Sequence, residues 1–403
     1  MSLDRRSLYK FPWSRTDNPG GWIEVTDECN LKCPGCYRHR IEGHRPLDEI
    51  KTDILAFRKL VNCDRIAIAG GEPLSYPDIV EVVGFVRRLG LKPMLLSNGV
   101  NLTWELARDL KKAGLVLIYF HADSGQQRPG WENKTEAEMN GLRQHYADFM
   151  AELGGVQCGY NITVTRSTLR YLPDVVEWAR ANISKVQHLS LIAFRALPRT
   201  SQVVYSVNGR ELDPRTVPNS TDRLEEISIT AEEIYDLLER RFPDSRACAY
   251  LGGTTKPNSY KFLIVLNVSS RSQVYGTLGA RTSELVQVFH HLLKGRYCAF
   301  YPRAGRRVFL LSLFDPEVKR ALGSFLRASV RNPARLFERI HVQCINIQQP
   351  FEVIDGQVNL CDGCLNMMLF KGKLINSCRL DEHRMLGGPL ATWLNTRAPD
   401  PER

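Results

Sequence analysis

Short apolar runs alternate with longer amphipathic segments along residues 21–198. Six runs are typical of buried strands: 22–26, 65–69, 92–96, 115–122, 157–164 and 186–194. Five segments between them carry apolar residues at helical spacing: 48–61, 78–89, 104–113, 134–153 and 174–181. Gly90 and Gly114 follow the second and third of these segments, where the end of a helix favours a residue that tolerates positive φ.

This alternation predicts six βα units around a parallel sheet, fewer than the eight of a complete barrel. The predicted fold class is therefore α/β, with a partial (β/α)6 barrel of the TIM type. The predicted divisions are a lead segment at 1–20, the barrel at 21–198, a mixed α/β insertion with basic amphipathic helices at 199–340, an α+β region with a second cysteine cluster at 341–390, and a tail at 391–403. Because parallel sheets place their sites at the carboxyl ends of strands, the residues just after each strand are the first candidates for function.

The eleven cysteines are distributed unevenly. Three lie within eight residues after the first strand, with C-x3-C-x2-C spacing: Cys29, Cys33 and Cys36. Three thiolates so close together can bind an iron–sulfur cluster that keeps one iron open, or a zinc ion completed by another ligand; His39 and His44 are nearby. Four other cysteines are scattered, which is typical of small buried residues: Cys63, Cys158, Cys248 and Cys298.

The next three predicted strands also end in polar or glycine residues. The segments are Gly70-Gly71-Glu72-Pro73, Ser97-Asn98-Gly99 and His121-Ala122-Asp123-Ser124. Each one alone is compatible with a tight turn between a strand and a helix. Together with the three cysteines, they give four successive strand ends with chemically useful groups, which predicts one shared site at this edge of the sheet.

This ordered set resembles the signature of the radical S-adenosylmethionine (radical SAM) superfamily, in which a C-x3-C-x2-C loop follows the first strand and a GGEP segment follows the second. The resemblance covers about residues 21–198. It implies an enzyme with a [4Fe–4S] cluster on Cys29, Cys33 and Cys36, whose open iron binds the amino and carboxylate groups of S-adenosylmethionine. It also implies a set of residues that contact this cosubstrate: Gly70, Gly71, Glu72, Ser97, Asp123 and Tyr37.

Within that set, the resemblance implies that the GGE segment meets the methionine amino group and that Asp123 contacts the ribose, with Ser97 as a second candidate. Members of the family usually have an aromatic residue before the third cysteine, beside the adenine. This chain has Gly35 there, so Tyr37 is the candidate for that contact. Two further candidates lie on and after the fifth strand, where a role in the core or in a salt bridge is the alternative: Asn161 and Arg166.

The resemblance also implies the chemistry. A reduced cluster gives one electron to the sulfonium, a C–S bond breaks, and a 5′-deoxyadenosyl radical removes a hydrogen atom from an unactivated C–H bond. A small electron donor of the flavodoxin or ferredoxin type would be a partner. The subclass, whether oxidoreductase, transferase or lyase, is left open. A non-catalytic iron–sulfur or zinc scaffold is the hypothesis from another class, and it fits less well because the three cysteines and the GGEP segment are intact.

A second cysteine cluster lies near the C-terminal end, with C-x16-C-x2-C-x13-C spacing: Cys344, Cys361, Cys364 and Cys378. Asp355-Gly356 and Lys371-Gly372 stand between apolar runs and predict two hairpin turns, with the C-x2-C pair between the hairpins. Four thiolates can bind one metal centre, so we predict an auxiliary [4Fe–4S] cluster, with structural zinc or no metal as alternatives. The spacing does not match the seven-cysteine extension of peptide-maturing radical SAM enzymes.

The net charge is +10, and most of it comes from residues 294–343, which hold eleven Lys/Arg and three Asp/Glu. At helical spacing, one face here is mostly free of the basic residues: Leu322, Phe325, Leu326 and Ser329. The pattern predicts either an amphipathic helix pair packed on the barrel or a surface for anions such as lipid headgroups, a phosphorylated substrate or RNA. Few aromatic residues lie among the arginines, so nucleic acid is the least favoured partner.

The basic region, together with a general likeness to radical SAM enzymes of hopanoid and tetraether lipid formation, favours a lipid- or isoprenoid-like or otherwise anionic substrate. Modification of a peptide or protein is the alternative, although the 20 residues before the barrel are too few for a leader-binding domain. Apolar runs stay well below the 18 residues of a spanning helix, and four of the first ten residues are charged. We therefore expect a cytoplasmic protein, with peripheral membrane contact as an open alternative.

Overall fold

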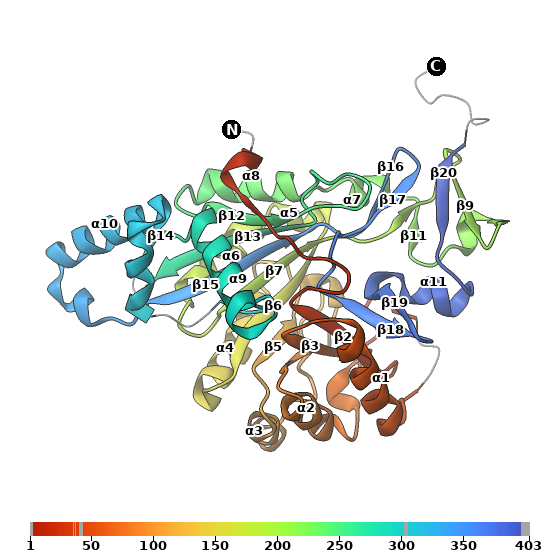
Figure 1. Ribbon diagram of the computed structural model, residues 1–403, viewed down its shortest axis with the longest axis horizontal. Helices are drawn as coiled ribbons and strands as arrows, with labels where there is room; N and C mark the ends of the chain where they lie inside the picture. Colours follow the sequence, from red (N-terminus) through yellow and green to blue (C-terminus); the bar gives the residue numbers. More distant parts are fainter. Residues whose placement is uncertain are drawn as a thin grey trace.

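The computed structural model describes residues 3–34, 36, 38–39, 43–271, 273–301 and 305–395. Its centre is a sheet of thirteen strands, in which the six predicted strands lie side by side and run parallel (Figure 1). These are β2 (Gly20–Thr26), β3 (Arg65–Gly70), β4 (Lys92–Ser97), β5 (Leu117–His121), β6 (Gln157–Val164) and β7 (His188–Ala193). The ends of the sheet do not pair with each other, so the prediction of a partial barrel is confirmed.

Helices cover the outer face of these strands: α1 (Leu47–Leu60), α2 (Ile79–Arg88), α3 (Trp104–Ala113), α4 (Asn140–Leu153), α5 (Arg166–Leu169) and α6 (Leu172–Ala181). The ends of α3 follow local chemistry, because the Thr103 hydroxyl accepts from the backbone N–H of Leu106 and Gly114 adopts a φ of 99°. The prediction of a helix from residue 134 was wrong, since α4 begins at Asn140. Turns precede it and bring Glu136 into the core.

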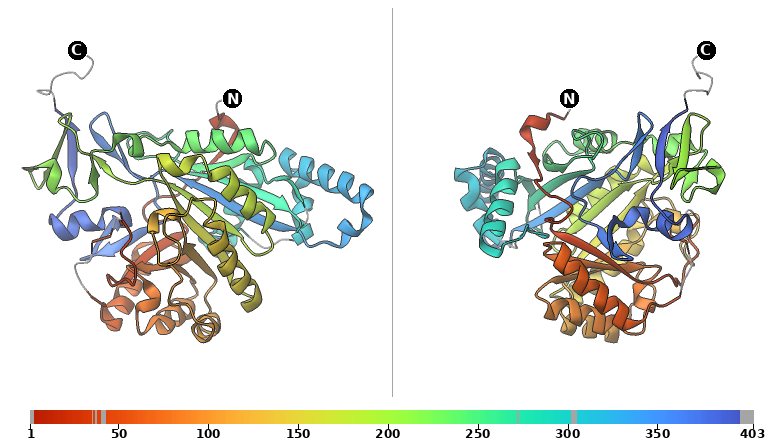
Figure 2. Two further views of the ribbon diagram at one scale, coloured as in Figure 1. Left: turned by 180° about the vertical axis from the view of Figure 1, so that it is seen from behind. Right: turned by 45° about the vertical axis from the view of Figure 1, so that its right-hand side comes forward.

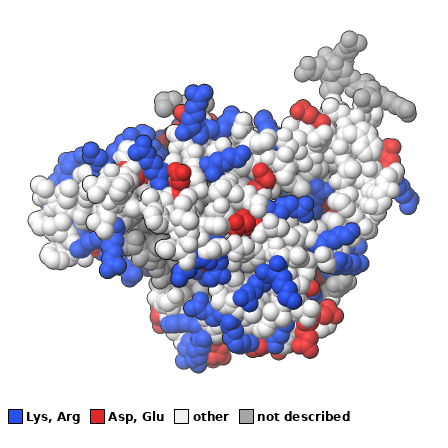
Figure 3. Space-filling view, in the orientation of Figure 1, with Lys and Arg blue, Asp and Glu red and all other residues white. Residues whose placement is uncertain are grey.

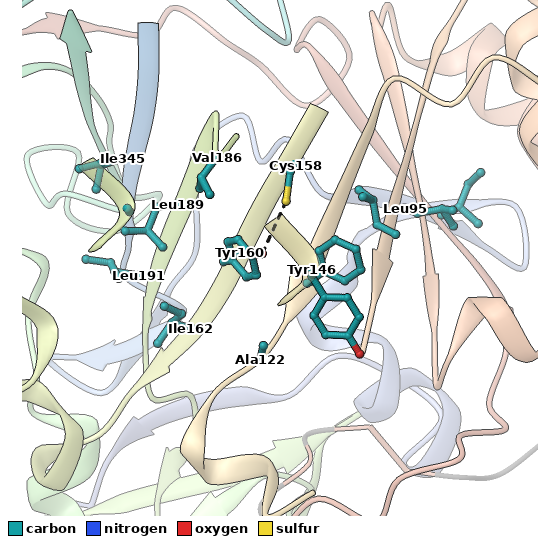
Figure 4. Packing of buried hydrophobic residues seen from close by; sticks show 14 of the residues in the cluster. Leu95, Ala122, Tyr146, Cys158, Tyr160, Ile162, Val186, Leu189, Leu191 and Ile345 are labelled. Carbon is teal, nitrogen blue, oxygen red and sulfur yellow. Dashed lines mark hydrogen bonds between the residues drawn. The ribbon is translucent and has the colours of Figure 1, made fainter. Parts of the chain in front are cut away.

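Apolar side chains fill the space between the sheet and the helices (Figure 4). Tyr160 and Ile162 of β6 pack near Leu189 of β7, and Tyr146 of α4 closes this layer from the outside. Burial of such side chains provides the main favourable free energy of folding. As predicted, the four scattered cysteines are buried: Cys63, Cys158, Cys248 and Cys298.

The sheet continues beyond the predicted barrel. β15 (His341–Gln348) pairs in parallel with β7, and β13 (Phe262–Ser269) pairs antiparallel with β15. The remaining strands on this side are β12 (Ala247–Leu251), β1 (Tyr9–Lys10) and β14 (Val274–Thr277), near which lie α8 (Ala231–Arg241) and α9 (Ala280–Lys294). Ile345 of β15 joins the core beside Leu189 and Leu191 (Figure 4), so the C-terminal half extends the same sheet and core.

The two predicted hairpins are confirmed. They are β16 (Glu352–Ile354) with β17 (Gln357–Asn359), and β18 (Met367–Phe370) with β19 (Lys373–Asn376). Asp355 and Gly356 both have positive φ, 50° and 75°, as a two-residue hairpin turn requires. β18 pairs in parallel with β2 at Met367 and Gly21, so the extension borders the barrel at both edges.

The last described elements are α11 (Leu380–Met385) and β20 (Ala391–Leu394). β20 pairs with β9 (Val203–Val207), and β10 (Arg210–Leu212) lies on the other side of β9. These strands and α10 (Pro316–Arg331) lie at opposite ends of the molecule (Figure 2).

The basic region forms one α-helix rather than the predicted pair. α10 stands between two 3-10 segments, η5 (Gly305–Leu313) and η6 (Pro333–Phe337). Phe325 and Ser329 of the predicted apolar face are buried, but Leu326 is 50% exposed. Within the part of the chain that the structure describes, no helix has the length and apolar character needed to cross a bilayer.

Candidate functional site

A cavity of about 1250 Å³ lies against the sheet and reaches both cysteine clusters. The predicted site residues that line it are Cys29, Cys33, Cys36, Gly70, Gly71, Ser97, Asp123, Asn161, Cys344, Cys361, Cys364 and Cys378. They come from the ends of β2 to β5, from β6 and β15, and from the segments around β18 and β19. The structure therefore joins the two clusters, far apart in the sequence, in one chamber. Gly35 and Tyr37 lie outside the described residues, so the adenine contact stays a prediction.

The loop of the first cluster begins and ends on the same edge of β2. The Thr26 hydroxyl lies 2.8 Å from His44 Nδ1, and the Asp27 N–H donates to the Gly43 carbonyl at 3.2 Å. Burial, together with the nearby thiols of Cys36 and Cys29, raises the pKa of Cys33 to about 12. Thiols so close together disfavour one another's ionised form, and a metal cation among them would stabilise the thiolates.

His39 and His44, the nearby candidates for a fourth ligand, have other partners. His39 Nδ1 lies 3.1 Å from the carboxylate of Asp381, and His44 contacts Thr26 and the Glu28 carboxylate. Asn98 comes closer to the cysteines, since its Nδ2 donates to Cys29 Sγ at 3.8 Å. In these contacts, neither His39 nor His44 serves as a fourth ligand beside the three cysteines.

The glycine pair lets the end of β3 touch the cysteine loop. A Cβ on Gly71 would lie 2.3 Å from the Glu28 carbonyl oxygen, and one on Gly70, whose φ is +140°, would lie 2.2 Å from the Thr26 carbonyl oxygen. At this distance the backbones hydrogen bond directly, from Gly71 to Thr26 at 2.8 Å and from Glu72 to Glu28 at 2.7 Å. Glycine is needed here because the cysteine loop occupies the space of a side chain.

Glu72 is 1% exposed and holds the ends of two strands together. Its carboxylate accepts from the Ser97 hydroxyl at 2.6 Å, and from the N–H groups of Asn98 at 2.7 Å and Leu74 at 2.9 Å. Burial raises its pKa, and these donors only partly oppose the rise. Ser97 and Glu72 are therefore hydrogen bonded to each other. A contact of either residue with the cosubstrate stays a prediction.

Asp123 pairs with His121 at the wall of the cavity. Its Oδ2 lies 2.7 Å from His121 Nε2 and accepts from the Thr163 N–H at 3.0 Å, and among the described residues none donates a hydrogen bond to Oδ1. Burial alone would raise the pKa of Asp123, but the charge and hydrogen bond of His121 outweigh it and lower the pKa to about 2. The same pairing raises the pKa of His121 against the effect of burial.

A second buried ion pair fixes the loop that carries Asp123. Arg143 and Glu136 are fully buried and paired, and the Arg143 Nε donates to the Ala122 carbonyl at 3.0 Å. The other oxygen of Glu136 accepts from the N–H and the hydroxyl of Ser124, at 2.9 and 2.7 Å. The residues on both sides of Asp123 are thus held by one buried pair.

A third network joins the cysteine loop to the C-terminal helix α11. Arg38 pairs with Glu24 of β2 and donates to Asp381 of α11 at 2.8 Å, and all three side chains are at most 5% exposed. Asp381 also accepts from the backbone N–H of His39 at 3.2 Å. Burial would raise the pKa of Asp381, but Arg38 and His39 outweigh it and lower the pKa. We call Glu24, Arg38 and Asp381 the loop clamp.

A parallel contact supports the loop clamp, since Arg384 of α11 binds the Asp27 carboxylate through both guanidinium nitrogens. Sequence reasoning missed the loop clamp, and it noted Asn98 only as part of the strand end Ser97-Asn98-Gly99 and not as a candidate site residue. Arg38, two residues after the third cysteine, was visible as a charged neighbour of the motif, but its partner Asp381 lies 343 residues away and carries no local signal.

The second cluster is gathered only in part. The Cys361 and Cys364 thiols share a hydrogen bond that, with burial and the nearby Cys378, raises the pKa of Cys361; the same bond lowers the pKa of Cys364. Burial raises the pKa of Cys344 to about 12, with no thiol of the cluster contributing. The structure therefore brings the Cys361 and Cys364 thiols into contact and places Cys378 near them.

The register of the sheet explains why Cys344 lies apart. Cys344 stands opposite Leu266 in mid-strand, whereas Cys361 bridges to Gly253, beyond the pair of Leu251 with Phe262. Four residues of β13 separate positions 262 and 266, which is about 13 Å along the strand. Cys344 as a ligand of the same metal stays a prediction that this register does not favour.

Arg166 forms a salt bridge, which was the alternative to a role in the site. It pairs with Glu233 of α8 and also donates to the Glu225 carbonyl at 3.0 Å. Asn161 lines the cavity, so its candidacy stays a prediction.

The loop clamp predicts a local effect of Asp381→Asn. The change leaves the buried Arg38 with one carboxylate. We expect it to cost about 2 kcal/mol in the opening of the loop, less than the roughly 3–5 kcal/mol for complete removal of one partner, because asparagine keeps an oxygen that accepts from Arg38. Amide hydrogen exchange in peptides from residues 24–39 should become roughly 30-fold faster. Asp222→Asn, which breaks the exposed pair with Arg199, is the matched control. Unchanged exchange in Asp381→Asn would contradict the role of the loop clamp.

The pair of Asp123 and His121 predicts a pH window. Its stabilisation through Asp123 is present above the unfolded pKa of 3.8 and is lost as the pH falls toward about 2. Its stabilisation through His121 is present below 6.5 and is lost as the pH rises through the raised pKa. In Asp123→Asn, burial and the charges of Arg128 and Arg143 remain without the opposing carboxylate, so the pKa of His121 should fall below its wild-type value. Histidine-selective NMR, with the resonance assigned by His121→Gln, measures the pKa of His121 in wild type and in Asp123→Asn. An equal or higher pKa of His121 in Asp123→Asn would refute the pairing.

Comparison with known proteins agrees with this geometry. Residues 23–179 match the model of the radical SAM superfamily. A PqqA peptide cyclase of Streptomyces rochei is 32% identical over 149 residues, which cover 36% of this chain and 39% of that protein. An Fe-coproporphyrin III synthase of Methanosarcina barkeri is 24% identical over 176 residues, which cover 41% of this chain and 42% of that protein. The chain thus spans about two fifths of the length of these relatives.

Among solved structures, Streptococcus suis SuiB bound to S-adenosylmethionine is similar with a TM-score of 0.39 and 16% identity, over 56% of this chain and 47% of that chain. The superfamily model covers most of β2 and all of β3 to β6, the strands whose ends carry the cysteine loop, the glycine pair and Asp123. Over residues 23–179, this chain therefore matches the radical SAM superfamily.

Proposed function

We propose that this protein is a radical SAM enzyme that cleaves S-adenosylmethionine reductively and abstracts a hydrogen atom from an unactivated C–H bond of an organic substrate. The observation that carries the proposal is one cavity of about 1250 Å³ lined by Cys29, Cys33, Cys36, the glycine pair and Asp123. Its volume exceeds the ordinary range of small-molecule sites, so it has room for a cosubstrate and a substrate together.

The residues present fit the cofactor that the family binds. Three thiols close enough to raise the pKa of Cys33 suit a [4Fe–4S] cluster with one open iron. When bound, this cluster supplies one electron to the sulfonium of S-adenosylmethionine, from a small donor of the flavodoxin or ferredoxin type, and so generates the radical that takes the hydrogen atom.

The chain's own residues would hold the cosubstrate and keep it in place. Gly70 and Gly71 leave backbone close to the cysteine loop, and Asp123 has one carboxylate oxygen available for a ribose hydroxyl. The pairing with His121 keeps Asp123 ionised, so it can act as an acceptor over the whole physiological pH range. The buried pair of Arg143 and Glu136 limits the motion of this acceptor.

For the substrate, we favour a lipid- or isoprenoid-like molecule with an anionic head. Arg307 and Arg339, both exposed members of the basic region, line one part of the cavity and could bind such a head. Modification of a peptide is the second candidate, and the similarity to PqqA peptide cyclases over 149 residues supports it. The polar residues Asn161, Thr163 and Ser190 on the cavity wall are compatible with either, because both carry groups that form hydrogen bonds.

Metal analysis and turnover test the proposed activity. After anaerobic reconstitution, Cys29→Ala/Cys33→Ala/Cys36→Ala should bind about four fewer irons per chain than wild type. Its formation of 5′-deoxyadenosine from S-adenosylmethionine and a strong reductant should fall to background. Cys63→Ser, which changes a buried cysteine away from the cavity, is the control and should keep both. Equal iron content in the triple variant and wild type would refute the cluster, and background turnover in reconstituted wild type would refute the activity.

We further propose that Cys361, Cys364 and Cys378 hold a second metal centre, an auxiliary [4Fe–4S] cluster or a zinc ion. Support comes from the hydrogen bond between the first two thiols and from the nearby third. Arg195 is close to Cys378 and opposes the rise that burial causes in its pKa, so it favours the thiolate that a metal needs.

Metal loss in cysteine variants distinguishes a three-cysteine site from a four-cysteine site that includes Cys344. If three cysteines hold the metal, Cys361→Ala/Cys364→Ala/Cys378→Ala should lose about four irons, or one zinc, and Cys344→Ser should lose none. Both variants keep the first cluster, so their formation of 5′-deoxyadenosine controls for folding. Equal metal loss in Cys344→Ser would restore the four-cysteine site expected from the spacing.

A further inference from the structure

The end of the molecule formed by η5, α10 and η6 exposes large apolar side chains. Six of them are at least 50% exposed: Leu310, Leu313, Phe314, Leu326, Val330 and Phe337. They come from 28 consecutive residues, and η5 and η6 both pack against α10. Single exposed apolar residues are common, but a group of this kind on one projecting part marks a binding surface.

The outward surface of α10 is divided into stripes. At 100° per residue, the buried face is centred on Val318, Phe325 and Ser329. Leu326 and Val330 lie together about 100° from that centre, with Lys319 in line with them. A third stripe, on the remaining side, is basic: Arg320, Arg327 and Arg331. An apolar stripe beside a basic one, both facing solvent, is the pattern of a helix at a membrane interface.

The net charge of the η5–α10–η6 end is positive. Residues 305–340 hold eight Lys/Arg against three Asp/Glu. One of the acids, Asp315, is 2% exposed and caps α10 through the N–H groups of Glu317 and Val318. Figure 3 shows the result at the left end of the molecule, where uncharged surface is bordered above and below by Lys and Arg. The surface is complementary to an apolar layer edged by anions.

We propose that the η5–α10–η6 end docks on the surface of a bilayer that contains anionic lipids. Its leucine, valine and phenylalanine side chains enter the boundary between headgroups and acyl chains, and its arginines contact lipid phosphates. A second copy of this chain is a poorer occupant, because it would bring one basic surface against another. RNA would attract the arginines but would leave the apolar stripe without a partner.

The cavity reaches the same end. Arg307 of η5 and Arg339, just after η6, line it. Docking would therefore bring the membrane next to one side of the cavity, where a lipid-like substrate could enter. This last consequence rests on the proposed function; the docking itself does not depend on catalysis.

Co-sedimentation of the full chain with vesicles tests the docking. Wild type should bind vesicles of phosphatidylcholine in which about one third of the lipid is phosphatidylglycerol. It should bind much less to phosphatidylcholine alone, and binding should weaken as salt is raised. R320E/R327E/R331E should bind at least about 100-fold more weakly, since each basic residue near an anionic surface contributes about a factor of five to ten.

Two further variants separate the docking surface from general charge and from folding. R58E/K59E/K112E makes the same change of charge on exposed residues of α1 and α3 and should bind almost as well as wild type. L326S/V330S removes only apolar groups and should weaken binding by at least about tenfold even at low salt. All variants should form 5′-deoxyadenosine at the wild-type rate, which verifies their fold independently of docking.

Three results would overturn the proposal. The first is a failure of wild type to bind anionic vesicles at low salt. The second is an equal loss of binding in R58E/K59E/K112E and R320E/R327E/R331E, which would indicate a response to total charge alone. The third is wild-type vesicle binding by L326S/V330S combined with a change in its oligomeric state by light scattering, which would assign the apolar stripe to a second copy.

Discussion

The structure around the cavity depends on one buried arrangement of charge, in which Arg38 of the cysteine loop lies between Glu24 of β2 and Asp381 of α11. Charges are costly to remove from water, and they remain buried only when their partners are well placed. The arrangement therefore fixes three parts of the chain at once: the first strand of the barrel, the loop with the three cysteines, and the C-terminal extension. A loop that holds a metal in a precise geometry needs such support from the structure around it.

The central sheet gives this arrangement its frame. β15 continues the sheet beyond β7, and β18 adds to the opposite edge beside β2, so the extension borders the barrel on both sides. The thiols of the second cluster reach the cavity because of this continuity, since the segments that carry them are anchored to β2 and to Gly253, just after β12. The extension is thus part of the architecture of the chamber and closes sides that an open sheet would leave to solvent.

Much of this could be predicted from local patterns. The six parallel strands, the two hairpins and the residues at the strand ends follow from periodicity, turn residues and spacing, all of which act over a few neighbouring positions. Gly71 is a good example, since a glycine at the end of a strand already indicates a close approach of another segment. The pattern could not indicate that β15 would pair with β7, because strand partners distant in sequence are chosen by the packing of the whole sheet.

The sequence pattern also did not predict which charged residues pair with each other. Arg38 and Asp381 are unremarkable in the sequence, and only the fold makes them neighbours. Cys344 shows the reverse case, where suitable spacing suggested a common site but the register of a long strand separates it from the other thiols. Likewise, Leu326 looked like a core residue by helical spacing, although the face it occupies is turned to solvent.

The separation of Arg38 from Asp381 also has a consequence in time. The two residues are 343 positions apart, and a ribosome adds about 5–20 residues per second. For roughly 20 to 70 s after Arg38 is made, the cysteine loop has no counter-charge from α11. During this interval the three thiols belong to a loop without its final support, so their positions are less restricted than in the complete chain. Synthesis of α11 brings that interval to an end.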